Sequence, residues 1–153
     1  RLSLFPFLLF GSGSSGLGLE KGRFVEVYSV LVTCIAGSPT SIGNAALTNR
    51  KVAFNQQINA VTPYKDVAPI FLYGLLRVAK PLVQRSTTLG MKRIITKSKF
   101  EKLLLIKPPL SKQEKFAQIV QRYERLRSQQ RESLRQAEHL FECLLNQAFE
   151  EGV

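Results

Sequence analysis

The chain is short of the residues from which most catalytic and metal sites are built. It has one histidine, His139, and two cysteines, Cys34 and Cys143, which stand far apart with no C-x-x-C spacing. This pattern excludes a disulfide framework and a zinc site of the usual spacing, and it is typical of a reducing, cytoplasmic compartment. A Ser-His-Asp or Cys-His arrangement would have to use His139, close to the carboxy-terminal end.

Two further features weigh against a catalytic or metal centre. His139 and Cys143 stand four residues apart, but a metal would need two more ligands, so a solvated helix face is favoured. Acidic residues are scarce before residue 112: Glu20, Glu26, Asp66 and Glu101. Four scattered acids do not suggest a two-metal site, and no acid is followed two positions later by lysine.

Phosphate-binding glycine loops are also missing. Gly37 and Gly43 bracket five residues, but Asn44 follows where lysine would be needed, and no G-x-G-x-x-G opens a helix after a strand. We therefore expect no enzyme activity and no cofactor of the chain's own.

No long apolar run is present. The apolar stretch at residues 2–10 is too short for a bilayer, which takes ~20 residues, and a Gly/Ser-rich stretch at 11–16 reads as a flexible linker. We assign no function to residues 1–21 and treat them as an unassigned, linker-like segment.

Positive charge is abundant, and it is unevenly distributed. The net charge is +11; residues 1–111 hold 15 Lys and Arg against four acids, whereas residues 112–153 hold seven of each sign. A basic part followed by a neutral part suggests that one binds a polyanion and the other binds protein. Nucleic acid is the favoured polyanion, an anionic membrane surface is second, and a basic protein without either role stays open.

The hydrophobic pattern predicts an α+β fold with a small mixed sheet. Residues 24–35 are rich in β-branched and aromatic residues and predict one or two strands, followed by a loop at 37–41. Short strands are expected at 51–54 and 58–62, and a buried strand at 103–106. Asp66 is expected to cap a helix that Pro81 ends, with Pro69 in its first turn.

A long helix is predicted over residues 111–151, opened by a Ser111/Glu114 capping box. Its apolar positions recur in steps of three and four, which is a coiled-coil pattern. A rod of ~60 Å cannot bury such a seam on a small domain and so needs a partner helix, although a helix folded back on its own domain is the alternative. The seam consists of Phe116, Ile119, Tyr123, Leu126, Gln130, Leu134, Ala137, Phe141, Leu144 and Ala148.

Three segments in order carry a resemblance to a known family. They are residues 30–35 (VLVTCI) with 41–46 (SIGNAA), residues 53–61 (AFNQQINAV), and residues 106–115 (IKPPLSKQEK) leading into the long helix. Over about residues 22–151 the chain resembles the specificity (S) subunit of type I restriction–modification systems. The resemblance implies a partial DNA target recognition domain at 22–110 and a spacer helix at 111–151.

The resemblance also implies partners. Spacer helices of the family pair as an antiparallel coiled coil and set the distance between two half-sites in double-stranded DNA. The chain would be a non-catalytic subunit that docks methyltransferase (M) and restriction (R) subunits and pairs with a second specificity half or a second copy. S-adenosylmethionine, ATP and Mg²⁺ would belong to those partner subunits.

Candidate DNA-binding residues fall on four loops. The basic, hydroxyl-rich loop before the last strand supplies Arg85, Thr87, Thr88, Lys92 and Arg93, with a solvated basic loop as the alternative. Asn55, Gln56 and Gln57 could contact adenine, but a structural role in a turn is favoured. Weaker candidates are Thr40, Ser41, Asn44, Asn49, Arg50 and Lys51.

Two alternative functions remain at this stage. The chain could be a coiled-coil scaffold whose basic face binds RNA or acidic protein, or a truncated, non-functional specificity subunit. A steep salt dependence of duplex binding would separate the first hypothesis from the scaffold.

Overall fold

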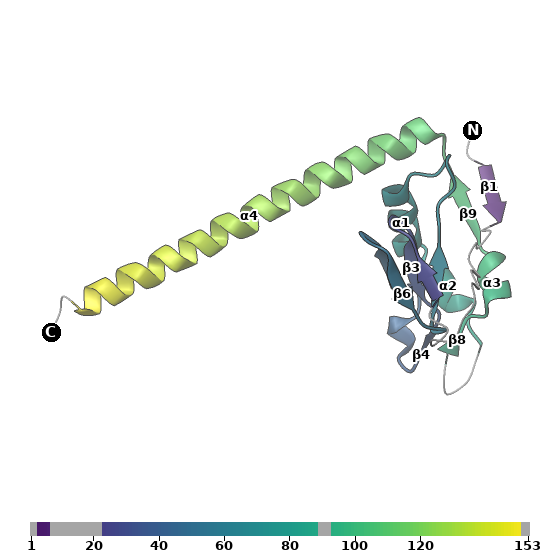
Figure 1. Cartoon of the computed structure of the whole chain (residues 1–153), viewed down its shortest axis with the longest axis horizontal. Helices are drawn as coiled ribbons and strands as arrows, with labels where there is room; N and C mark the ends of the chain where they lie inside the picture. The colour runs from purple at the N-terminus through teal and green to yellow at the C-terminus, as the bar shows by residue number, and fades with distance from the viewer. Residues whose placement is uncertain (1–2, 7–22, 89–92, 151–153) are drawn as a thin grey trace. The chain divides into compact units, whose positions relative to one another are not determined.

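The computed structural model describes residues 3–6, 23–88 and 93–150 and has an α+β fold, as predicted (Figure 1). Its contacts divide the chain into two compact units, residues 1–117 and residues 118–153, which we call the body and the arm. The predicted loop candidate Lys92 lies outside the described residues.

The centre of the body is a three-stranded antiparallel sheet in the order β5-β3-β7. Strand β3 (Val30–Thr33) pairs Val30 with Leu47 of β5 (Ala45–Leu47) and with Val61 of β7 (Ile58–Val61). At its other end Thr33 pairs with Ile58. This register gives the sheet two ends, which we call the Val30 end and the Thr33 end.

Three two-stranded ribbons complete the β structure. Strand β2 (Arg23–Val25) pairs with β6 (Val52–Phe54), and β4 (Ile35–Ala36) pairs with β8 (Arg93–Ile94). Strand β1 (Ser3–Pro6) pairs with β9 (Leu104–Lys107). The single apolar run at 24–35 is thus divided among three strands, whereas the short strands expected at 51–54 and 58–62 are confirmed.

Helix α1 (Pro69–Val78) supplies the other layer of the core. Leu72 and Leu76, spaced one turn apart, are buried with Val30 and Val32, whose alternation puts both side chains on one face of the sheet. The expectation that Asp66 caps this helix is wrong, because Ala68 holds the N-cap position and Pro69 directly follows it. The Asp66 side chain pairs with Lys107 instead.

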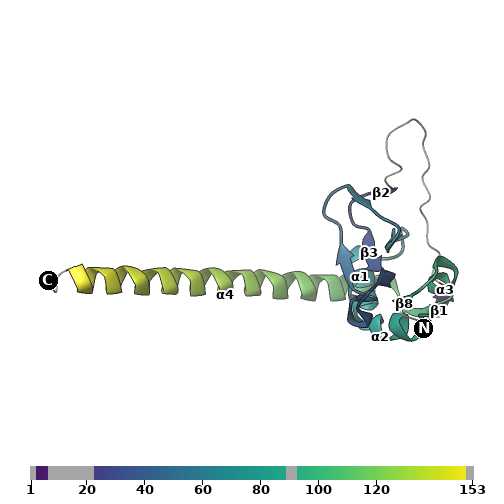
Figure 2. The same cartoon turned by 90° about the horizontal axis from the view of Figure 1, so that it is seen from below.

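The segment after α1 contains two short helices and strand β8 (Figure 2). Helix α1 ends before Pro81 as predicted, but α2 (Lys80–Arg85) begins there and holds Pro81 in its first turn, where a missing N–H costs nothing. Helix α3 (Lys97–Glu101) is capped by Thr96, whose hydroxyl accepts a hydrogen bond from Lys99 N–H, and a short 3-10 helix covers Pro39–Ser41.

Helix α4 (Leu110–Glu150) confirms the predicted long helix and runs for 41 residues without proline or glycine. It begins at Leu110, so the capping-box prediction is wrong: Ser111 is already helical, and Lys112 N–H and Gln113 N–H bond to the Pro109 carbonyl. The preceding strand is buried only at alternate positions, since Leu105 is buried while Leu104 and Ile106 are exposed. Among the described residues, no helix is both long and apolar enough to cross a membrane.

Candidate nucleic-acid interface

The predicted DNA-binding residues divide between the two ends of the sheet. The turn Asn55–Gln57 connects β6 to β7 at the Thr33 end, because Ile58 pairs with Thr33. Arg50 and Lys51 follow β5 at the Val30 end, because Leu47 pairs with Val30. A sheet strand of four residues is ~13 Å long, so the two groups are separated by about that distance along the sheet.

The Asn55–Gln57 turn has a clear structural role. The Asn55 Oδ1 atom accepts a hydrogen bond from Gln57 N–H at 3.0 Å, and the Gln57 carbonyl accepts from both Cys34 N–H and Ile35 N–H, at 2.8 and 3.1 Å. These bonds account for the turn without DNA. The Gln56 and Gln57 side chains are exposed, so they are available at the surface of this turn.

The segment Cys34–Ala36 lies between this turn and the end of the predicted loop at residues 85–93. Its Ala36 pairs with Arg93, and the Cys34 carbonyl accepts a hydrogen bond from Ile95 N–H at 3.0 Å. Gln57 and Arg93 therefore flank the same short piece of backbone. The structure brings together two loops that are separated by 36 positions in the sequence.

The loop from Arg85 to Arg93 is closed by its own hydroxyl groups. Thr87 Oγ1 donates to the Gln84 carbonyl at 2.7 Å, and the Thr88 hydroxyl and amide both donate to the Ile94 carbonyl, at 3.2 and 2.9 Å. The donating protons of both hydroxyls are thus engaged, which leaves their oxygens as acceptors. Arg85 is exposed at the last position of α2, and Arg93 is half-buried.

Sequence reasoning missed Arg23. The β2–β6 register pairs Arg23 with Phe54, the residue before the Asn55–Gln57 turn, so this exposed guanidinium lies at the Thr33 end as well. The pairing of β2 with β6 could not be read from spacing. Its signal in the sequence is only a basic residue at the start of an alternating strand.

The weaker candidates Thr40, Ser41 and Asn44 lie on a loop that contacts α2, and the Asn44 side chain is itself engaged there. Lys80 Nζ donates to Asn44 Oδ1 at 2.6 Å, and Gln84 Nε2 donates to the carbonyls of Pro39 and Ile42. Gly43 has a φ of +78°, and a Cβ there would lie 3.3 Å from the Lys80 carbonyl oxygen. The loop is therefore held against α2.

Most positive charge of the body has no carboxylate near it. Within the described part, Glu26 pairs with Lys51 at 2.8 Å, Glu101 with Lys97 at 3.9 Å, and Asp66 with Lys107. The guanidinium groups of Arg23, Arg50, Arg85 and Arg93 have no such ion pair among the described residues. The Lys51 charge is largely cancelled, whereas the arginines at the Thr33 end remain available to a polyanion.

The buried cysteine at this end is not a reactive group. Cys34 is 2% exposed, and burial raises the pKa of its thiol to about 11. The thiol therefore stays protonated near neutral pH and packs as a small apolar side chain.

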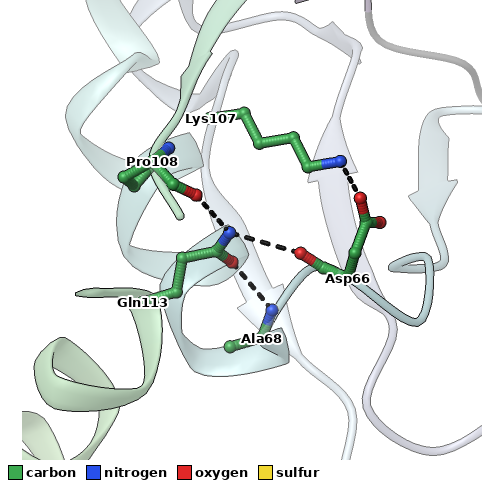
Figure 3. A network of polar contacts seen from close by, with 5 residues as sticks. All are labelled: Asp66, Ala68, Lys107, Pro108 and Gln113. Atoms are coloured by element: carbon green, nitrogen blue, oxygen red, sulfur yellow. Dashed lines mark hydrogen bonds and ion pairs between the residues drawn. The ribbon is translucent and has the colours of Figure 1, made fainter. Parts of the chain in front are cut away.

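A second polar network holds the first turns of α4 within the body (Figure 3). The Gln113 side chain is fully buried; its Oε1 accepts from Ala68 N–H at 2.9 Å, and its Nε2 donates to the carbonyls of Pro108 at 2.8 Å and Asp66 at 3.3 Å. The Lys107 ammonium pairs with the Asp66 carboxylate, and this hydrogen bond holds the pKa of Asp66 below its usual value.

Phe116, predicted as the first seam residue, also contacts the body. Its ring lies edge-on to Phe71 of α1, with centroids 5.9 Å apart, and a Cβ at Gly74 would lie 2.8 Å from its Cζ atom. The first two turns of α4 are thus part of the body's packing, which the seam pattern did not predict.

The arm exposes a continuous apolar face. Ile119, Tyr123, Leu126, Leu134, Phe141 and Leu144 are each more than half exposed, and Gln130, Ala137 and Ala148 are exposed too. Side-chain ion pairs such as Glu132–Arg135, at 2.6 Å, lie along the helix. His139 Nδ1 and Cys143 Sγ are 3.8 Å apart, and no metal-ligating cluster of three or more residues occurs in the described part of the chain.

Comparisons with known proteins agree with this architecture. The HsdS subunit from Thermoanaerobacter tengcongensis superposes with a TM-score of 0.53 at 16% identity, over 68% of this chain and 24% of that one. A chain from a structure of complex assembly and conformational transition of the type I R-M system gives a TM-score of 0.54 at 19% identity, over 72% and 27%. This chain therefore spans about a quarter of the length of these structures.

The sequence comparisons identify the family. A search of curated proteins found no match. The model of the type I restriction modification DNA specificity domain matches residues 11–136, which is more than half of the chain. The chain belongs to the family of type I restriction modification DNA specificity domains.

Proposed function

We propose that this chain is the DNA-reading part of a type I restriction–modification specificity subunit and recognises one half-site in double-stranded DNA. Family membership supports a role in DNA specificity. The expectation of a basic part that binds DNA and a neutral helix that binds protein agrees with the division into body and arm.

The observation that carries the proposal is the collection of arginine, amide and hydroxyl side chains at the Thr33 end. Arginine can hold phosphates and read guanine, and glutamine can read adenine through two parallel hydrogen bonds. In support of this, the strand registers place Arg23, the Asn55–Gln57 turn and Arg93 at the same end of the sheet. The proposed interface consists of Arg23, Asn55, Gln56, Gln57, Arg85, Thr87, Thr88 and Arg93. Lys92 is added on the sequence alone, because it lies outside the described residues.

Within this interface the arginines and the amides have different tasks. Arg23, Arg85 and Arg93 supply charge for the phosphates, while Gln56 and Gln57 are exposed on a turn whose backbone is already bonded. Because Asn55 is engaged in the turn, we assign it the positioning of Gln56 and Gln57 rather than base contact.

The arm is the proposed assembly element. A helix with an exposed apolar face needs a partner, so we propose that the arm pairs with the spacer helix of a second specificity half or of a second copy. We further propose that the chain docks methyltransferase and restriction subunits in the cytoplasm and carries out no catalysis itself. S-adenosylmethionine, ATP and Mg²⁺ would then bind those subunits.

Duplex binding at several salt concentrations tests the DNA interface. Fluorescence anisotropy with a 30-bp duplex pool of random sequence should give a steep salt dependence, because phosphate contacts release counterions. The double variant Arg85→Ala/Arg93→Ala should bind about 10- to 100-fold more weakly, with a log–log salt slope reduced by about two.

A matched control separates a specific interface from diffuse charge. Lys112→Ala/Lys115→Ala removes two charges at exposed positions on the first turns of α4, outside both ends of the sheet, and should change binding little. Equal losses in the two double variants would contradict an interface at that end.

Light scattering tests assembly. A dimer, or a defined complex with the cognate methyltransferase subunit, would support pairing through the arm. A monomer that does not bind that subunit would contradict it.

A further inference from the structure

The turn Glu26–Ser29, which we call the Tyr28 turn, contains an unusual backbone conformation. Tyr28 has a φ of +66° and is the one residue other than glycine with positive φ in the described part of the chain. This left-handed region suits glycine and asparagine, and it is uncommon for a bulky aromatic residue.

Buried hydrogen bonds impose this conformation. The Thr48 hydroxyl accepts from Ser29 N–H at 3.0 Å and lies 2.9 Å from the Glu26 carbonyl and 3.1 Å from the Ser29 carbonyl. Tyr28 N–H donates to the Thr48 carbonyl, and the Ser29 and Thr62 hydroxyls are 3.1 Å apart. Ser29 and Thr48 are buried, so the turn is held rigidly from the inside.

The Tyr28 side chain lies mostly at the surface of the body. The ring is 59% exposed, and no hydrogen bond of its hydroxyl is found among the described residues. Asparagine would adopt the same backbone conformation with less strain. A strained, rigid and exposed aromatic residue points to a function outside the folding of this chain.

The surroundings of the turn are apolar and basic. Phe24, on β2, is 63% exposed and Val27 is 41% exposed. Arg50 follows Thr48 by two residues, and the one acid nearby, Glu26, is already paired with Lys51 at 2.8 Å. The Arg50 guanidinium therefore remains as a positive charge beside the turn, which suits an anionic ligand.

We propose that the Tyr28 turn is a second DNA contact, in which the Tyr28 ring packs against a base or sugar in a groove while Arg50 holds a flanking phosphate. This inference rests on the proposed function and extends the interface to the Val30 end of the sheet. Aromatic and apolar side chains contact nucleotides in this way in many DNA-binding proteins, and the ~13 Å between the two ends is shorter than the ~34 Å of one helical turn of DNA.

A protein partner is the competing occupant, since tyrosine, phenylalanine and arginine are also common in protein interfaces. Charge decides between them. The β2–β6 ribbon and its turn carry Arg23, Arg50 and Lys51 against the single acid Glu26, within a body whose excess charge is positive throughout. A polyanion is the ligand that this balance favours.

The test is the variant Tyr28→Asn, measured in the full chain for both duplex binding and thermal stability. Asparagine keeps the turn and relieves its strain, so the melting temperature should stay unchanged or rise. Binding to the 30-bp random duplex pool should weaken about tenfold, with an unchanged salt slope because no phosphate contact is lost. Val78→Asn, which replaces an 81% exposed apolar residue on α1, is the matched control and should bind as the wild type does.

The outcomes separate this inference from the proposed function. If the wild-type chain and Tyr28→Asn bind the duplex equally well, the inference alone is overturned. If the wild-type chain does not bind the duplex at all, the inference and the proposed function are both overturned. A Tyr28→Asn variant that keeps duplex binding but loses the methyltransferase subunit would make the turn a protein contact instead. If Tyr28→Asn and Tyr28→Gly both lower the melting temperature by 5 °C or more, the ring is structural and the inference is wrong.

Discussion

Replacing Gln113 by alanine is the perturbation whose consequence the structure defines most fully. The side chain amide joins three backbone groups from two separate segments: Ala68 N–H, the Pro108 carbonyl and the Asp66 carbonyl (Figure 3). The residue is 0% exposed, so water does not reach the amide in the folded chain. Gln113→Ala removes the partner of each group and leaves a small polar cavity.

The expected cost follows from the groups left unpaired. A buried donor or acceptor without a partner costs about 1–3 kcal/mol. The hydrogen bonds to Ala68 and Pro108 are short, whereas the bond to Asp66 at 3.3 Å is weaker. We therefore count the full cost of an unpaired buried group for Ala68 N–H and for the Pro108 carbonyl only. We expect a loss of about 3 kcal/mol and a fall in the melting temperature of about 10 °C for a body of this size.

The assay should follow the body rather than the long helix. Near-ultraviolet circular dichroism reports on tyrosine packing, and Tyr28, Tyr64 and Tyr73 all lie in the body. Gln118→Ala, at an exposed position of the same helix, is the matched control and should be neutral or slightly stabilising because alanine favours helix. A Gln113→Ala variant that loses less than about 1 kcal/mol would refute the argument that the buried amide stabilises the body.

The variant Gln113→Glu adds a pH signature. A carboxyl group would keep the bond from Ala68 N–H, but its second oxygen would face the carbonyl oxygens of Pro108 and Asp66. Its protonated form is favoured there, so its pKa in the folded chain should rise above the ~4.3 of an ordinary glutamate. Stability should therefore be close to wild type below about pH 4 and decline as the pH rises through the folded pKa.

Three further predictions concern contacts of the body and the arm. Gly74→Ala should lower the urea midpoint, because its Cβ would lie 2.8 Å from the Phe116 ring, and adding Phe116→Leu should recover part of the loss; an unchanged midpoint would show that the ring moves freely. Asp66→Asn should reduce the difference in the free energy of unfolding between pH 7 and pH 3. Lys107 lowers the pKa of Asp66, so the ion pair stabilises the folded chain at neutral pH, and this stabilisation is lost as the pH falls through that pKa. Leu134→Asp should abolish pairing of the arm in sedimentation experiments, whereas Ser128→Asp, on the opposite side of the helix, should leave it intact.

Local patterns predicted most of the elements correctly. Alternation and β-branched residues marked the strands at 52–54 and 58–61, and the steps of three and four marked α4 over its whole length. These signals are local because each strand or helix buries one face of its own sequence. The helix boundaries were less accurate. Asp66 and Ser111 are both of residue types that favour the N-cap position, but Asp66 lies before the N-cap of α1 and Ser111 lies within α4.

The Asp66 error has its physical origin in contacts with a distant segment. The Asp66 carboxylate is drawn to Lys107, 41 residues away, and Gln113 supplies the side-chain oxygen for the Ala68 N–H that precedes α1. Gln113 thus does for α1 part of what a local capping residue would do. A cap supplied from a distant segment leaves no mark at the helix terminus, so sequence spacing could not reveal it.

The placement of the residues that we propose for DNA binding also depends on pairing between distant strands. Composition alone indicated that the body binds a polyanion, but Arg50 and Arg93 look equivalent in the sequence and lie at opposite ends of the sheet. Arg23 shows the converse: it stands in a stretch with no other sign of function, and one register, Arg23 opposite Phe54, brings it beside the Asn55–Gln57 turn. Since a shift of one residue in that register would turn the Arg23 side chain to the other face of the ribbon, the same composition would then present a different surface to DNA. Charge therefore predicts the class of ligand for this family member, while the strand register determines which of its arginines are placed for the proposed interface.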